Sequence, residues 1–107
     1  MLLVCRFQPD AAAGFAERAQ RALALLTAAP GCLGGELGRA VDDPAHWVLT
    51  VRFASVDAYR RALSPFVVRE HVVPLLSEAL PELSTFETLV SAVDGRATVH
   101  PSLLADG

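Results

Sequence analysis

The stretch DDPAHWVLTVRF, residues 42–53, decides the fold of this chain. From Trp47 to Phe53 every second residue is large and apolar, which is the period of a β-strand, and we expect a strand over residues 46–53. The two aspartates and the proline that open the stretch are turn residues. Residues 32–41, before the turn, form a weaker strand that its glycines loosen. Strand, turn and strand in this order predict an antiparallel hairpin.

Upstream of the hairpin, the pattern predicts a strand followed by a long helix. Residues 2–8 are apolar on both faces, as in a strand buried on both sides, and Arg6 interrupts the second face. We expect Asp10 to cap a helix over residues 11–28, where apolar residues recur at helical spacing. The pair Pro30-Gly31 ends this helix.

Downstream of the hairpin, the pattern predicts two helical segments and a last strand. Ser55 caps a short helix, and Ser64-Pro65 has the form of a second helix start. We expect that second helix over residues 66–80, kinked at Pro74, which lacks an amide hydrogen. The valines near its start also favour a strand, so this segment is ambiguous. The last strand is expected over residues 82–93.

The resulting order, β-α-β-β-α-β, is typical of an α+β fold of the ferredoxin-like type. It predicts a four-stranded antiparallel sheet with the helices on one face, in a single domain over residues 1–93. Residues 94–107 are expected to form a C-terminal tail. The first and third strands are apolar on both faces, so we expect a second copy to cover the bare face in a homodimer.

Composition excludes several classes of protein. The chain has 107 residues, 52% of them hydrophobic, which indicates either a subunit interface or a dense core. Its net charge is −3 and its basic residues are scattered, so no nucleic-acid-binding face is expected. No apolar run is long enough to span a membrane, and nothing resembles a signal peptide, so we expect a cytoplasmic protein. Cys5 and Cys32 are then expected as reduced thiols, with a disulfide as the alternative.

Four features carry a resemblance to a known family. They are the Pro30-Gly31 turn, the hairpin sequence DPAHWVL at residues 43–49, the step VRFASVDAY from strand to helix at residues 51–59, and His71. Over residues 1–92 the chain resembles the antibiotic biosynthesis monooxygenase (ABM) family of dimeric α/β-barrel proteins. The resemblance implies a ferredoxin-like dimer with a pocket between helices and sheet.

The family resembled includes cofactor-free oxygenases of aromatic polyketides, quinol monooxygenases and haem-degrading enzymes. In the haem-degrading branch, the pocket uses an Asn on the first strand, a Trp at the end of the third strand and a His on the second helical segment. The corresponding places here hold Arg6, Phe53 and His71, so only the histidine matches. These departures argue against haem degradation. The resemblance to the other branches implies chemistry without a metal or other cofactor.

His71 and Arg6 are the candidate catalytic residues. His71 lies on or beside the inner stripe of its helix, and a histidine side chain suits acid–base work at neutral pH. Its structural alternative is a histidine bonded to the backbone. Arg6 on a buried strand must either pair with a carboxylate, such as Glu36 or Glu87, or line a polar cavity. In a cavity it would stabilise an oxyanion.

Aromatic residues are the candidate walls of a substrate pocket, although each also suits a plain apolar core. Tyr59 adds a hydroxyl that could orient a ligand. The three histidines are dispersed, and two cysteines without nearby histidines make a poor zinc site, so we expect no metal centre. The candidate substrate-binding residues are Trp47, Phe53, Tyr59 and Phe66, with Phe86 as a further candidate.

These observations favour a cofactor-independent monooxygenase that oxidises a small electron-rich aromatic molecule, a quinol or an anthrone, with dioxygen. His71 would accept the proton and Arg6 would stabilise the resulting oxyanion. Two alternatives stay open. One is a binding protein without turnover, for a hydrophobic metabolite or haem, and the other is a structural or regulatory dimerisation module.

Overall fold

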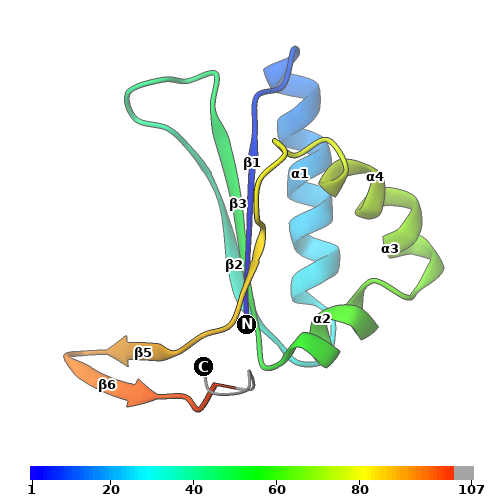
Figure 1. Ribbon diagram of the computed structural model, residues 1–107. Helices are drawn as coiled ribbons and strands as arrows, with labels where there is room; N and C mark the ends of the chain where they lie inside the picture. The colour runs from blue at the N-terminus through cyan, green and yellow to red at the C-terminus, as the bar shows by residue number, and fades with distance from the viewer. Residues whose placement is uncertain (103–107) are drawn as a thin grey trace.

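A four-stranded antiparallel sheet with helices on one side forms the body of the molecule (Figure 1). The structure is a computed structural model and describes residues 1–102. The strands lie in the order β2-β3-β1-β4. Their bounds are β1 (Leu2–Phe7), β2 (Cys32–Arg39), β3 (Trp47–Phe53) and β4 (Thr85–Phe86), and those of the helices are α1 (Ala12–Thr27), α2 (Val56–Ala62), α3 (Phe66–His71) and α4 (Val73–Leu76).

This arrangement confirms the α+β, ferredoxin-like fold. The sheet is open, so the described part of a single chain does not close into a barrel. No helix among residues 1–102 is long and apolar enough to cross a bilayer.

The hydrophobic core lies between the sheet and α1. Alternate residues of β1 and β3 point to the helices, because side chains of a strand alternate between its faces. On α1, buried residues recur at helical spacing and meet them. The buried residues of the sheet and α1 are Leu3, Cys5, Phe7, Phe15, Ala19, Ala22, Leu26, Leu49, Val51 and Phe53.

Two helix starts can be compared with their predictions. Ser55 caps α2 as expected, and its Oγ accepts a hydrogen bond from the Ala58 N–H at 3.0 Å. The prediction that Asp10 caps α1 is wrong, because the cap position falls on Ala11 and carries no side-chain hydrogen bond. Asp10 lies one residue before the cap position.

The expected helix over residues 66–80 is two short helices, α3 and α4, separated at Val72. Pro74 lies in the first turn of α4, where its missing N–H has no helical partner to lose. The chain therefore breaks before the proline rather than at it.

The expected last strand over residues 82–93 is wrong in extent. Only Thr85 and Phe86 pair with β1, whereas β5 (Val90–Val93) pairs with β6 (Arg96–Val99) in a separate hairpin. Asp94 and Gly95 turn this hairpin with positive φ angles of 53° and 77°, the combination of a type I′ turn. Figure 1 shows the hairpin projecting from the sheet. Of the expected tail, residues 103–107 lie outside the described residues.

The face of the sheet opposite the helices is bare in this chain. Leu2, Val4 and Val48 on it are half-buried, and Arg6 is exposed. The prediction that β1 is buried on both faces is therefore not met within one chain.

Candidate active site

A small cavity lies at the edge of β1, where β4 is too short to cover the strand. The Val4 N–H donates to the Ser84 carbonyl at 2.7 Å, and the Leu80 N–H donates to the Arg6 carbonyl at 2.7 Å. Between these two bonds, residues 81–83 leave the strand edge. The cavity has a volume of about 150 Å³. Its lining comprises Leu3, Val4, Cys5, Arg6, Tyr59, Leu76, Ala79, Leu80, Glu82 and Ser84.

Ionisable residues line this cavity from both faces of β1, because Cys5 points toward the helices and the adjacent Arg6 points to the open face. Arg6 and Glu82 form an ion pair, with 3.1 Å between Nε and Oε1, and both side chains are about half exposed. Burial raises the pKa of the Cys5 thiol. Burial also raises the pKa of the Tyr59 hydroxyl, with a smaller contribution from Cys5. The cavity therefore has a thiol and a phenol on its helix side and an exposed ion pair at its rim on the open face.

The structure does not bring the two predicted catalytic residues together. Arg6 lies on β1 and lines the cavity from the strand edge. His71 is the last residue of α3, is half-buried, and does not line this cavity. Arg6 pairs with a carboxylate, as one of the two predicted alternatives has it, but the carboxylate is Glu82 and neither Glu36 nor Glu87.

The predicted aromatic wall is only partly assembled. Tyr59 lines the cavity, and its ring lies 5.4 Å from that of Phe53, which is 1% exposed and belongs to the core. Phe66 is 72% exposed at the start of α3 and lines no part of this cavity. Trp47 packs edge-on against Phe15 at 5.5 Å, away from the cavity lining. Their substrate-binding roles therefore remain predictions, with direct geometric support only for Tyr59.

Trp47 has one further feature. Its indole Nε1 is buried and forms no hydrogen bond with any described residue, and the Arg39 guanidinium lies over the ring at 5.3 Å. A buried N–H group without a hydrogen-bond partner lowers the stability of the fold. The ring stabilises the fold instead through the apolar area that it buries and through its contact with the Arg39 cation.

Sequence reasoning missed Glu82. It opens the segment expected as the last strand and has no periodic or motif signal of its own. It reaches the cavity because its N–H donates to the Leu80 carbonyl at 2.8 Å, a bond between residues two apart that closes a tight turn.

Other hollows of the described residues are larger. One of about 310 Å³ is lined by the predicted residues Tyr59 and Phe86, and one of about 460 Å³ lies along the β5–β6 hairpin.

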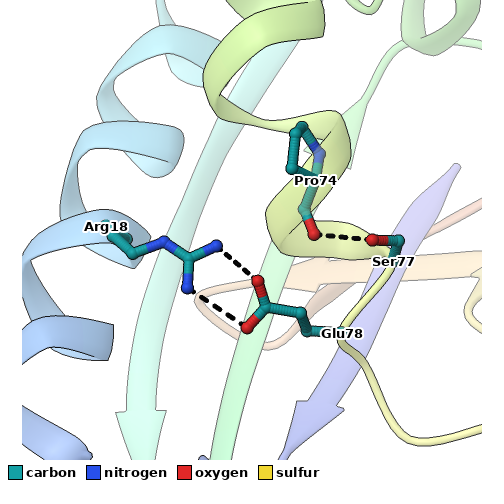
Figure 2. A network of polar contacts seen from close by, with 4 residues as sticks. All are labelled: Arg18, Pro74, Ser77 and Glu78. Atoms are coloured by element: carbon teal, nitrogen blue, oxygen red, sulfur yellow. Dashed lines mark hydrogen bonds and ion pairs between the residues drawn. The ribbon is translucent and has the colours of Figure 1, made fainter.

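Two more hollows lie beside the helices. One, of about 540 Å³, opens where β1 leads into α1. Figure 2 shows its paired side chains: Arg18 of α1 donates to Glu78, which follows α4, through its two terminal nitrogens, Nη1 and Nη2. The other is an apolar groove of about 440 Å³ between the end of α1 and α3, in which Arg61 is the ionisable side chain. Neither contains a predicted site residue.

Among residues 1–102, no three or more His, Cys, Asp or Glu side chains form a group that could hold a metal ion. Cys5 and Cys32 are free thiols, one buried and one half-buried. The β1-edge cavity is lined by two of the predicted site residues, Arg6 and Tyr59.

Comparison with known proteins identifies the family. Residues 2–65, more than half of the chain, match the model described as antibiotic biosynthesis monooxygenase. The chain therefore belongs to that family, as its sequence resemblance predicts. Among curated proteins, no significant match was found.

Solved structures share the fold. The cofactor-independent oxygenase SnoaB from Streptomyces nogalater is 27% identical, with a TM-score of 0.66, over 82% of this chain and 94% of that one. Rv0793 from Mycobacterium tuberculosis is 19% identical, with a TM-score of 0.63, over 95% of this chain and 93% of that one. A conserved protein from Methanosarcina mazei Go1 is 16% identical, with a TM-score of 0.63, over 78% and 84%. The last two likenesses concern the fold alone.

Proposed function

We propose that this chain is a cofactor-independent monooxygenase that oxidises a hydroquinone of one aromatic ring with dioxygen. Family membership supports the reaction class, and so does the 27% identity to an oxygenase that works without a cofactor. The observation that carries the proposal is the β1-edge cavity, a space of limited size lined by Tyr59 from the helix side, with the Arg6–Glu82 ion pair at its rim.

The volume of the cavity supports one of the two substrate types that the sequence left open. A space of about 150 Å³ is the size that holds a single benzene ring in an engineered apolar cavity. The three fused rings of an anthrone need more room. The geometry therefore favours a quinol.

The chemistry requires few parts from the protein. Removing a phenolic proton makes the ring electron-rich enough to pass an electron to dioxygen. Recombination of the resulting radicals forms a carbon–oxygen bond, and loss of water leaves the product. One hydroquinone and one dioxygen give one hydroxybenzoquinone and one water. The protein has to bind the ring, accept the proton and stabilise the phenolate.

Arg6 is the proposed phenolate partner, and Tyr59 is the proposed wall that orients the ring. The Arg6 guanidinium carries five N–H donors, and its Nε lies 3.1 Å from Glu82 Oε1 in the ion pair. Its remaining donors are available to an oxyanion at the mouth of the cavity. The raised pKa of Tyr59 keeps its hydroxyl a donor at neutral pH.

His71 stays a prediction as the proton acceptor, because its ring does not line the cavity and a movement of α3 would have to bring it there. The haem-binding alternative has less support, since haem is far larger than this space and the candidate ligand lies outside its lining. Trp47, Phe53 and Phe66 would act only by supporting the fold around the cavity.

We also propose that the protein works as a cytoplasmic homodimer. Opposed residues of β5 and β6 give the hairpin one wholly apolar face, formed by Val90, Ala92, Ala97 and Val99. A two-stranded hairpin is marginal on its own in water. The half-buried apolar residues of the bare sheet face are a matching surface on a second copy.

Oxygen uptake with a panel of hydroquinones and anthrones tests the proposed activity. We expect uptake with single-ring hydroquinones, formation of hydroxybenzoquinone in equal amount, and no uptake with anthrones. Absence of uptake with every hydroquinone would remove the proposed function. The variant His71→Ala tests the predicted acceptor, and unchanged activity would remove that role.

A further inference from the structure

The β1-edge cavity has four ionisable side chains in its lining, and each can be examined as a base. Arg6 is a permanent cation with no acceptor atom. Cys5 and Tyr59 have pKa values raised by burial, so both hold their protons at neutral pH. Glu82 is the remaining group, and it carries a carboxylate in an ion pair.

The contacts of Glu82 leave one of its oxygens available. Oε1 lies 3.1 Å from the Arg6 Nε in an ion pair, and Oε2 forms no hydrogen bond with another described residue. The bond from its N–H to the Leu80 carbonyl fixes the backbone at this point. Oε2 can therefore meet a substrate hydroxyl beside the cavity.

Arg6 offers a second donor on the same side of the strand. In an antiparallel pair, residues direct their N–H and C=O groups alternately to the two neighbouring strands. The Arg6 carbonyl accepts from the Leu80 N–H, so the Arg6 N–H points to this edge as well, yet segment 80–84 provides no backbone partner for it. Arg6 thus has a backbone donor at the cavity edge and a guanidinium on the open face beside Glu82.

We propose that Glu82 is the catalytic base of the reaction proposed above, and that it takes the phenolic proton of the hydroquinone while Arg6 stabilises the phenolate. The inference rests on the proposed function. The phenolic O–H bond breaks, its proton moves to Glu82 Oε2, and the electron pair stays on the phenolate oxygen. After dioxygen has added to the ring, the protonated Glu82 returns the proton to the hydroxide that leaves as water.

Glu82→Gln tests this role, because it keeps the shape of the side chain and removes its basicity. Turnover is measured by oxygen uptake with a series of hydroquinones of increasing acidity, from methyl- to chloro- and cyano-substituted rings. For the least acidic substrates, we expect a fall in kcat of about 10²- to 10⁴-fold, the usual contribution of a positioned base. The deficit should shrink along the series, because acidic hydroquinones are already ionised in solution.

Glu70→Gln is the matched control. Glu70 is an exposed carboxylate on α3 outside the cavity lining. We expect it to keep the wild-type rate with every substrate. Circular dichroism checks that both variants fold. Glu82→Ala with added formate is the second variant, and restored turnover would support a base at this position.

The outcomes separate this inference from the function on which it rests. If the wild type consumes no oxygen with any hydroquinone, both the proposed function and the assignment of Glu82 as the base are refuted. If the wild type is active and Glu82→Gln equals it, the function survives and the base assignment falls. An equal deficit with every substrate also overturns the assignment, because misplacement of Arg6 would act alike on all of them.

Discussion

On β3, Leu49 and Val51 point toward the helices and are fully buried, whereas Val48, Thr50 and Arg52 point to the open face and keep part of their surface accessible. The two faces of β3 therefore have different structural roles. The inner face holds the fold together through packing. The open face contributes little to the core of one chain, and it is free to carry an interface and the edge of a site.

The largest effect is expected from removing a buried side chain on the inner face. Leu49→Ala should lower the free energy of unfolding by about 2–5 kcal/mol, the range for a buried leucine. Denaturant titration measures it.

Val48→Ala is the matched control on the open face of the same strand, and we expect a smaller loss. The denaturant titration is repeated at two protein concentrations. If a dimer covers Val48, the free energy of unfolding depends on protein concentration. Equal losses at every concentration would contradict the difference between the faces.

Glycines offer a second comparison between a crowded and an open position. A Cβ on Gly35 would lie 2.5 Å from the Thr50 carbonyl oxygen, and backbone atoms yield little. Gly35→Ala should therefore destabilise the fold by about 1–3 kcal/mol, as overpacking does.

Gly14 on α1 has no atom within 4 Å of the corresponding Cβ position. Gly14→Ala should raise stability by about 0.5–1 kcal/mol, since alanine suits a helix better. Thermal unfolding measures the stability of the Gly35→Ala and Gly14→Ala variants. A lower unfolding temperature for Gly14→Ala would contradict the open space at this position.

The hairpin offers a test of the proposed dimer. Val99→Asp places a charge on the apolar face of the β5–β6 hairpin, and Thr98→Asp places it on the other face. We expect only the first to weaken dimerisation, by at least about tenfold, or 1.4 kcal/mol. Light scattering across a dilution series measures it. Equal behaviour of the two variants would exclude this face from the interface.

The smallest effect is expected at the Arg18–Glu78 pair, where both side chains are about half exposed. The bond from Arg18 lowers the pKa of Glu78 below its ordinary value of 4.5. A lowered carboxyl pKa stabilises the fold above the ordinary value, and this stabilisation is lost as the pH falls through the lower one.

Arg18→Gln should therefore cost at most about 1 kcal/mol at pH 7, as exposed pairs do. The difference from wild type should vanish in strong acid and shrink in high salt. A difference that persists at pH 2 would mean that packing of the arginine stem, rather than its charge, accounts for the loss.

Much of the fold could be predicted because strand and helix periods are local. The alternation from Trp47 to Phe53 identifies β3, and Ser55 marks the start of α2. The end of the last strand could not be read the same way, since an alternating pattern does not say which strand it pairs with. Asp94-Gly95 is a hairpin-turn signal that could have revealed β5 and β6.

The site was less predictable, because its geometry depends on contacts distant in sequence. Arg6 could be identified as a charge on an apolar strand, and it does line the cavity. Its partner Glu82 could not, since nothing in the sequence says where the chain leaves the edge of β1. The separation of His71 from Arg6 likewise depends on how α3 packs.

The two-residue length of β4 has a consequence for how relatives of this protein can diverge. The mouth of the cavity is formed by residues 80–84, which are tied to β1 by two backbone hydrogen bonds. Backbone bonds of this kind tolerate many side chains. Substitutions in this short loop can therefore widen, narrow or recharge the opening while the packed interior stays as it is, so that new substrate preferences can arise without rebuilding the scaffold.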